Sequence, residues 1–272
     1  MEAFKFEELE YVRPDFEGAK KVWEKATEQI KSAKSYAEVK EAMKSVEEME
    51  CHLQTLVTIC NIRNTLDTTD EFYEKEIEYI QNTYPTIVET GTEYNKAILE
   101  SSFKKDIEAE YGKEVLVSMQ REVDSFNPAL VPFMQKEGEL TTRYQKMMAT
   151  AQIPFRGETY NLYGIEKFFE HPDRQTRKEA FKAYSDFYHG NEAELEEIFS
   201  ELITVRNEMG KALGDENFIP LGYKQQGRSD YGQEEVASFR EQVRKEIVPL
   251  CEKLYKAQAK RIGVDEIKVY DE

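Results

Sequence analysis

An apolar stripe at helical spacing is the feature that most restricts how this chain can fold. The stripe follows Ser35 and Glu38, which we predict to form a capping box at the start of a helix. Apolar residues recurring three, four and seven positions apart predict an amphipathic helix, which must bury that face against other helices. The stripe consists of Val39, Met43, Val46, Leu53, Val57 and Cys60.

Similar spacing predicts long helices along most of the chain. Glycine and proline are scarce, at 13 and 8 of 272 residues, and this scarcity favours helices over a sheet with many turns. The sequence therefore predicts a mainly α fold, an antiparallel bundle of long helices. The predicted helices are Pro14 to about Ala33, the stripe helix, one that begins with a second capping box at Thr68 and Glu71 and is kinked or split at Pro85, 113–126, 128–149, Pro172 to about Tyr188, Glu192 to Leu213, and a last one from a cap at Asp230 to near Gly263.

One segment departs from the helical period. "QIPFRGETYNLYG", residues 152–164, alternates β-forming residues around Arg156-Gly157, which predicts a short hairpin. We divide the chain into two predicted domains, an N-terminal helical bundle over 1–150 and the hairpin with its following helices over 151–272. On the last helix we expect one apolar face, and the tail "VDEIKVYDE" reads as a short strand. The face comprises Val236, Phe239, Val243, Ile247, Leu250 and Leu254.

The charge and the cysteines restrict the partners and the compartment. Lys and Arg number 37 against 54 Asp and Glu, and the net charge of −17 disfavours nucleic acid and anionic lipid as partners. The N-terminus lacks the basic and apolar regions of a signal peptide, and no run of apolar residues is long enough for a membrane span. Cys51, Cys60 and Cys251 form no C-x-x-C pair, and their odd number fits a reducing cytoplasm.

The residues alone indicate no catalytic or metal site. His52, His171 and His189 neither begin nor end an H-E-x-x-H motif, which would place two imidazoles and a base on one helix face. Glu48 with His52, and Asp186 with His189, have helical spacing, but a di-iron bundle requires two Glu-x-x-His motifs and this chain has none. Phosphate-binding glycine loops and the G-x-S-x-G elbow are also absent. We therefore expect no catalytic residue and no metal ligand in this chain.

A glycine-rich stretch between two helical segments is harder to explain as a plain linker. "FIPLGYKQQGRSDYG", residues 218–232, reads as a loop that carries Tyr223, Arg228 and Tyr231. Together with Arg206, Met209, "KALG", "FREQV", "EIVPL" and "VYDE", it resembles the oligoendopeptidase F branch of the thimet-oligopeptidase family of zinc metallopeptidases. The upstream segments "IPFRGETYNLYGIEKFF" and "DRQTRKEAFKAYSDFY" are similar to the hairpin and helix of that family.

The resemblance implies a largely helical enzyme that cleaves short unstructured peptides inside a deep channel. In that family zinc is held by H-E-x-x-H and a downstream Glu, and those residues lie beyond the part that this chain resembles. The chain is thus expected to be the N-terminal half, with channel wall and scaffold but no zinc site, and inactive alone. Its expected partners are short peptides and the missing C-terminal half or a second chain that supplies it. Tyr223, Arg228 and Tyr231 are candidate substrate contacts, or structural residues at the junction between the halves.

Two other functions remain open on the sequence. The chain could be a non-catalytic helical module that binds peptides or a partner, which would make it stable and monodisperse. It could also be a helical structural protein with a chance similarity. The peptidase hypothesis differs from both because it predicts an exposed apolar surface where the second half docks.

Overall fold

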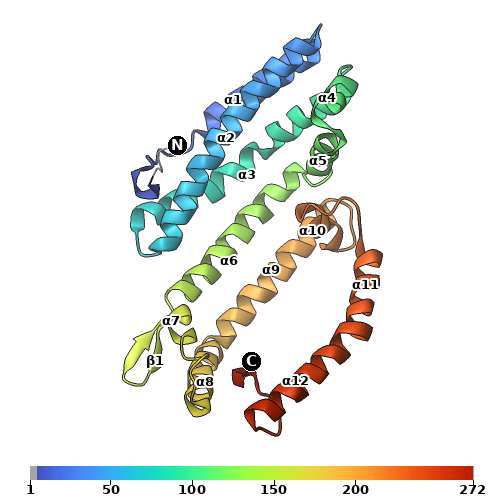
Figure 1. The fold of residues 1–272 in the computed structure, drawn as a ribbon. Helices are drawn as coiled ribbons and strands as arrows, with labels where there is room; N and C mark the ends of the chain where they lie inside the picture. Colours follow the sequence, from blue (N-terminus) through green and yellow to red (C-terminus); the bar gives the residue numbers. More distant parts are fainter. Residues whose placement is uncertain (1–4, 272) are drawn as a thin grey trace. The chain divides into compact units, whose positions relative to one another are not determined.

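The computed structural model describes residues 5–271 and confirms a mainly α fold. Within these residues there is one small hairpin, and every other regular element is helical (Figure 1). The α-helices are α1 (Phe16–Ser32), α2 (Tyr36–Leu66), α3 (Glu71–Glu100), α4 (Lys104–Tyr111), α5 (Lys113–Val123), α6 (Val131–Ala149), α7 (Leu162–Glu166), α8 (Arg174–Gly190), α9 (Glu192–Ala212), α10 (Ile219–Gln225), α11 (Gln233–Gln242) and α12 (Val248–Ile262). The strands are β1 (Ile153–Phe155) and β2 (Glu158–Tyr160), and short 3-10 or π turns are η1 (Phe6–Glu8), η2 (Pro128–Leu130), η3 (Val243–Ile247) and η4 (Val269–Asp271).

The chain forms two compact units, each built from two stretches of sequence. The first comprises Met1–Thr142 and Glu201–Ser229, and the second comprises Arg143–Ser200 and Asp230–Glu272. The predicted division into domains at residue 150 stays a prediction. Within residues 5–271, none of the helices combines the length and the apolar character that a bilayer span requires.

The first unit has its core between α1, α2 and α3, which lie side by side (Figure 1). The predicted stripe of α2 supplies much of this core: Val39, Val46, Leu53 and Cys60 are buried, and Met43 and Val57 pack against them. Burying one large apolar side chain contributes about 1.5–3 kcal/mol, so a stripe of this length decides where α2 lies. Other large members of the core are Phe16, Trp23, Ile87, Tyr94, Ile98 and Ile107.

The caps of these helices differ from the predicted ones. Ser35 makes no side-chain cap bond, although Glu38 Oε2 accepts a hydrogen bond from the Lys34 backbone N–H at 2.8 Å. Asp70, rather than Thr68, caps α3, because its carboxylate accepts from the first backbone N–H groups of the helix. Helix α3 also runs through Pro85 without being split. A carboxylate beside exposed N–H groups is as good a cap as a hydroxyl, so one suitable residue replaces another nearby.

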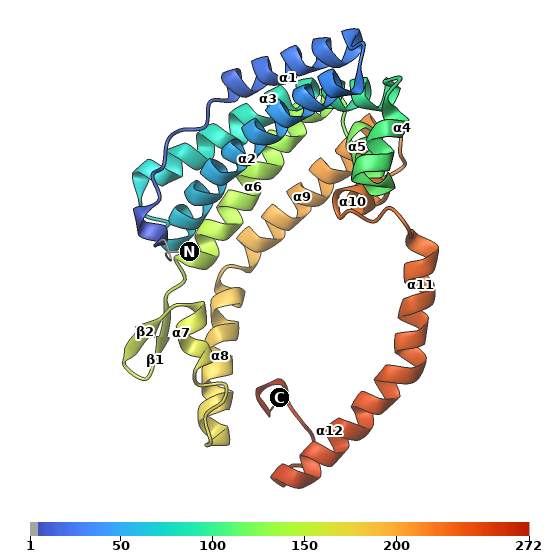
Figure 2. The ribbon, with the colours of Figure 1, turned by 45° about the horizontal axis from the view of Figure 1, so that its top comes forward.

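The predicted hairpin is present in the second unit. Ile153 pairs with Tyr160 and Phe155 with Glu158, and the turn lies at Arg156 and Gly157 as predicted. Figure 2 shows the hairpin beside α7 and α8. Ile153 and Phe155 pack there in a small core of the second unit, with Ile165 of α7 and Ala180 of α8.

The last long helix is one continuous curved element made of α11, η3 and α12 (Figure 2). Its cap is Gly232, whose backbone N–H donates to Glu235 Oε2 at 2.9 Å, so the predicted cap at Asp230 is wrong. Gly263 ends the helix in the left-handed conformation, with φ of 73°, near the predicted place.

The helix contains one wider turn, and one other expectation for this region is wrong. In η3 the Val248 N–H bonds five residues back, to the Val243 carbonyl. This wider turn shifts the side chains after it around the helix axis, and the six-residue apolar face stays a prediction. The tail forms the 3-10 turn η4 and no strand within residues 5–271. Glu272, the last letter of "VYDE", lies outside the described residues.

Residues 219–225, predicted as loop, form the short helix α10. Its Leu221 is fully buried against Leu130 and Met209, in a cluster that belongs to the first unit. The glycines of this stretch had indicated an irregular loop. Tertiary packing of Leu221 overrides that local preference and favours a helix.

Gly210 allows α9 to approach the chain that leads to α10. A Cβ built at Gly210 would lie 2.2 Å from the carbonyl oxygen of Asn217 and 2.5 Å from its carbon. Backbone atoms at that distance must move, and no side chain is available to yield. A hydrogen bond from the Asp215 N–H to the Gly210 carbonyl, at 3.0 Å, stabilises the turn that brings these segments together.

We expect Gly210→Ala to lower the free energy of unfolding by about 1–3 kcal/mol, the usual cost of overpacking. This outcome opposes helix propensity, since alanine is favoured over glycine inside a helix by about 1 kcal/mol. Gly190→Ala is the matched control, because nothing lies within 4 Å of a Cβ there. Urea unfolding of both variants measures the effect, and equal stability of the two would contradict the close approach.

Candidate functional site

Tyr223 and Arg228, two of the predicted substrate contacts, lie against each other in the first unit. The Arg228 guanidinium carbon is 4.8 Å from the centre of the Tyr223 ring, and the Arg228 backbone N–H donates to the Tyr223 carbonyl at 3.1 Å. A cation over an aromatic face is attracted by about 0.5–1 kcal/mol at a partly exposed site. Both side chains are half-buried. Each therefore has a structural role in closing the turn after α10.

The same turn is tied to the end of α5. Arg121 Nη1 donates to Ser229 Oγ at 2.9 Å, and Lys224 Nζ donates to the Asp124 carbonyl at 3.1 Å. The Ser229 hydroxyl is thus the acceptor for an arginine. The turn places Arg121, Lys224 and Arg228 close together in an otherwise acidic chain.

Tyr231, the third predicted contact, follows Asp230, the first residue of the later segment of the second unit. Its side chain is 47% exposed. It is followed directly by Gly232, the cap of α11. Tyr231 is thus on the surface at the start of the last long helix.

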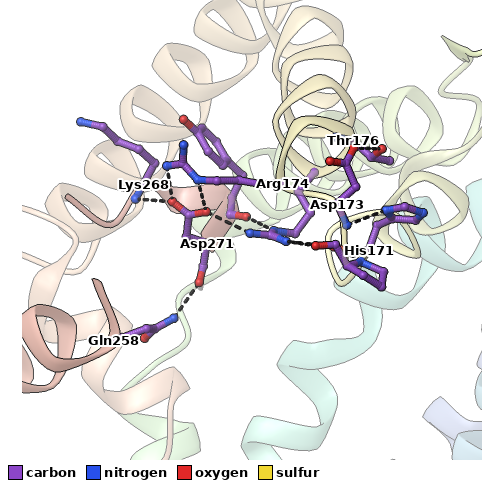
Figure 3. A network of polar contacts seen from close by, with 10 residues as sticks. His171, Asp173, Arg174, Thr176, Gln258, Lys268 and Asp271 are labelled. Atoms are coloured by element: carbon purple, nitrogen blue, oxygen red, sulfur yellow. Dashed lines mark hydrogen bonds and ion pairs between the residues drawn. The ribbon is translucent and has the colours of Figure 1, made fainter. Parts of the chain in front are cut away.

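Sequence reasoning missed a cluster around Asp271, which Figure 3 shows. The Asp271 carboxylate has no exposed area and accepts hydrogen bonds from Arg174 Nε at 2.8 Å, Arg174 Nη2 at 2.7 Å and Arg177 Nη2 at 3.1 Å. It also accepts from the Lys268 backbone N–H at 3.1 Å, and its own carbonyl accepts from Gln258 Nε2 at 2.6 Å. We call this set the Asp271 clamp.

The Asp271 clamp joins the turn η4 to α8 and to α12. Arg177 Nε donates to the Tyr270 carbonyl at 2.7 Å, and the Arg174 guanidinium lies 5.1 Å from the Tyr270 ring centre. The two arginines lie in the first turn of α8, which Asp173 caps by accepting from the Thr176 N–H at 2.9 Å. The geometry of the tail after Gly263 therefore depends on one buried carboxylate.

The arginines also set the protonation of this carboxylate. Hydrogen bonds from Arg174 are the largest influence, and they hold the pKa of Asp271 well below its usual value although burial raises it. The carboxylate is charged throughout the neutral range and is matched by two guanidinium groups. It is engaged on all sides, which makes it a structural group rather than a proton carrier.

Metal ligands are not grouped in the described part of the chain. Among residues 5–271, no three His, Cys, Asp or Glu side chains are placed to hold a metal ion. His171, beside the Asp271 clamp, accepts through Nδ1 from the Asp173 N–H at 3.1 Å (Figure 3). The donor set needed for a zinc site does not fit these residues.

The helix formed by α11, η3 and α12 leaves large apolar side chains exposed. Phe239 is 65% exposed, Leu250 51% and Leu254 59%. Single exposed leucines are ordinary, but these residues follow one another along one helix and form an extended exposed apolar surface. The other large apolar residues exposed on this helix are Ile247, Val248, Tyr255 and Ile262.

Comparison with known protein families matches most of the chain. A sequence model described as the peptidase M3 N-terminal domain matches residues 6–126, and one described as peptidase family M3 matches residues 168–272. A search of curated proteins gives no match. The second matched segment contains Tyr223, Arg228, Tyr231 and the Asp271 clamp.

Solved structures match the whole fold but only part of their own length. PZ peptidase A, solved with an inhibitor, is 37% identical with a TM-score of 0.95 over 98% of this chain and 48% of its own. An oligoendopeptidase F solved at 3.1 Å is 37% identical with a TM-score of 0.96, over 99% of this chain and 48% of its own. An oligoendopeptidase F from Bacillus anthracis strain Ames is 36% identical with a TM-score of 0.95, over 100% of this chain and 50% of its own. This chain spans about half the length of the structures it matches.

We expect Asp271→Asn to open the tail at neutral pH. Losing hydrogen bonds to charged groups costs about 1.5–3 kcal/mol each, so the backbone amide of Lys268 should exchange with solvent about tenfold to a hundredfold faster. Hydrogen exchange followed by mass spectrometry measures this. Asp265→Asn, an exposed aspartate in the same tail, is the control.

The pH dependence follows from the lowered pKa of Asp271. The clamp contributes its full stability above the unfolded value of about 3.9 and loses it as the pH falls from there towards the folded value. Protection of the tail in the unaltered chain should therefore be constant from neutral pH to about pH 5 and fall in stronger acid. Protection equal to that of Asp271→Asn at pH 7 would contradict the role of the clamp.

Proposed function

Because the chain belongs to peptidase family M3, we propose that it is the N-terminal portion of an oligopeptidase that hydrolyses short unstructured peptides. The match of the entire chain to one half of oligoendopeptidase structures carries this proposal. In it, the helices of this chain form scaffold and channel wall, and the catalytic groups come from the remaining half.

The exposed helix supports the same proposal. A long helix with Phe239, Leu250 and Leu254 in water needs a partner, since each buried apolar side chain contributes about 1.5–3 kcal/mol. The remaining half of the enzyme, or a second chain that supplies it, is the partner we propose for that surface. The three cysteines are all free, in keeping with a cytoplasmic protein.

In this proposal the zinc ligands belong to the remaining half of the enzyme. His52, His171 and His189 belong to no group of ligands in residues 5–271. When bound, zinc would supply a Lewis acid for peptide hydrolysis. This chain would contribute to that reaction by holding the peptide and excluding water, and would be inactive alone.

Tyr223, Arg228 and Tyr231 are the substrate contacts we propose in this chain. A guanidinium group can donate to peptide carbonyls or to a carboxylate, and a tyrosine offers both a ring and a hydroxyl. Tyr231 is the more exposed of the two tyrosines. Arg228 is already oriented by the Tyr223 ring, so little freedom would be lost when it bound a peptide.

We expect the chain to cleave peptides only when the other half is present. The experiment co-expresses it with the half of the Bacillus anthracis oligoendopeptidase F that it does not match, and assays an internally quenched short peptide. The complex should cleave the peptide, and a zinc chelator should abolish that cleavage. The chain alone should not cleave the peptide. Each half expressed without the other is the control.

Three outcomes would overturn this proposal. Chelator-sensitive cleavage by the chain alone would place a metal site within it. Binding of the peptide by the chain alone, with a complex that forms but never cleaves, would favour the non-catalytic binding module instead. A chain that neither binds peptides nor captures the other half would be neither enzyme part nor peptide-binding module.

The proposed substrate contacts can be separated from structural residues by kinetics in that complex. We expect Arg228→Ala to raise KM about tenfold with kcat nearly unchanged, since it removes binding shared by ground and transition states. Tyr231→Phe should raise KM less, because only the hydroxyl is lost. Tyr163→Phe, at a tyrosine that is 84% exposed on α7, is the control. A lower yield of complex with normal KM would show a purely structural role.

A further inference from the structure

Helix α12 carries a group of basic side chains without acidic partners. Within residues 5–271, no ion pair involves Lys253, Lys256, Lys260 or Arg261. The neighbouring cations differ, because Arg244 and Lys245 both pair with Glu241, at 2.7 Å and 3.3 Å. The chain as a whole has a net charge of −17, so unpaired cations grouped on one helix run against its composition.

The basic residues lie beside the exposed leucines of the same helix. Lys253, Lys256 and Lys260 are three and four positions apart, which places them on one face; we call them the α12 basic stripe. Leu250 and Leu254 share the adjacent face, and both are more than half exposed. Ala259 of the same helix is buried, and Gln258, one turn after Leu254, donates to the Asp271 carbonyl. The leucines and the three lysines nevertheless have exposed side chains.

Two ordinary explanations cover only part of this pattern. Cations at the end of a helix interact favourably with its dipole, but that effect is confined to the last turn and so accounts for Lys260 and Arg261 only. Lysines on a solvated face need no partner, but a solvated face would not have two exposed leucines next to it. A basic row at the edge of an exposed apolar row is complementary in charge to a partner whose edge is acidic.

The charge restricts which partner fits. A second copy of this chain would bring together two molecules of net charge −17, which repel each other. The structures that this chain matches contain as much polypeptide again as it covers, so a large covalent or separate partner exists in such proteins. That partner is the remaining half of the peptidase, and this inference rests on the proposed function.

We propose that α12 docks an acidic amphipathic helix of the remaining half. Its apolar side packs on Leu250 and Leu254, and its Asp or Glu side chains pair with the α12 basic stripe. The leucines supply the binding energy, and the lysines set the register and speed the encounter, as charges at the rim of an interface do. The Asp271 clamp holds the end of α12 in place beforehand, so docking loses little conformational freedom.

Charge reversal of the α12 basic stripe tests this inference. The variant is Lys253→Glu, Lys256→Glu and Lys260→Glu, and glutamate keeps the helix propensity of lysine. The matched control is Lys21→Glu, Lys25→Glu and Lys31→Glu on α1, all exposed and with the same change of charge. Leu250→Ser with Leu254→Ser tests the apolar part. Circular dichroism of each variant checks that the helices are retained.

Each variant is co-expressed with the unmatched half of the Bacillus anthracis oligoendopeptidase F, and the amount that co-purifies is measured at low and high salt. We expect the basic-stripe variant to reduce recovery of the complex about tenfold or more at low salt, with the control variant nearly unchanged. High salt should weaken the unaltered complex and reduce the difference between the variants, because screening removes the charge term. The leucine variant should fail at both salt concentrations.

The outcomes separate this inference from the proposed function. Normal recovery of the basic-stripe variant, with loss of the leucine variant, would overturn the acidic partner and leave the proposed function standing. An equal loss in the α1 control would show a general effect of charge and would also overturn it. Sedimentation of the chain alone as a dimer that the stripe variant abolishes would assign the surface to a second copy. Failure of the unaltered chain to capture the half-enzyme would remove the proposed function and this inference together.

Discussion

A long amphipathic helix is stabilised when its apolar side is buried, and the rest of this structure depends on that burial. Some long helices of this chain bury their apolar side within the chain, and one does not. In the first unit α1, α2 and α3 bury theirs together, since Trp23, Val46 and Ile98 belong to one core. The second unit contains a helix of similar length, from α11 to α12, whose large apolar residues stay in water. The difference lies in the partners, because both helices have apolar residues at helical spacing. Under the proposed function, this exposed surface is where the remaining half would pack.

The features that depend on apolar spacing and on the backbone conformation of single residues could be predicted from the sequence. The stripe of α2 is buried as its spacing predicts, the hairpin turns at Arg156-Gly157, and the last helix ends at Gly263 because a left-handed residue closes it. Caps were less predictable, since several polar residues near a helix start are nearly equivalent and the chain uses Asp70 and Gly232. Helix α10 was missed because the burial of Leu221 depends in part on Leu130 of η2 and on residues of α6, which are remote in sequence.

The candidate site shows the same division between local and remote information. The contact between Tyr223 and Arg228 joins residues five positions apart, and their segment had stood out by its composition. The Asp271 clamp joins residues 97 positions apart, so neither the arginines of α8 nor the aspartate indicated the other. The arginines and the aspartate both lie in segments that resemble the peptidase family. That resemblance marked the segments but did not indicate that these residues are in contact. Only the fold shows that they hold the tail against α8 and α12.

The Asp271 clamp and the exposed helix differ in what each would need from a partner. A buried carboxylate with one arginine removed would be strongly destabilising, but with two guanidinium groups and a backbone N–H its charge is compensated within this chain alone. The clamp therefore needs no contribution from a partner, whereas the leucines and lysines of α12 do. A polar contact that is complete before assembly fixes the helix, and an apolar surface that is incomplete drives assembly. Under the proposed function, this order, with rigidity first and burial second, would allow the two halves to meet without refolding either of them.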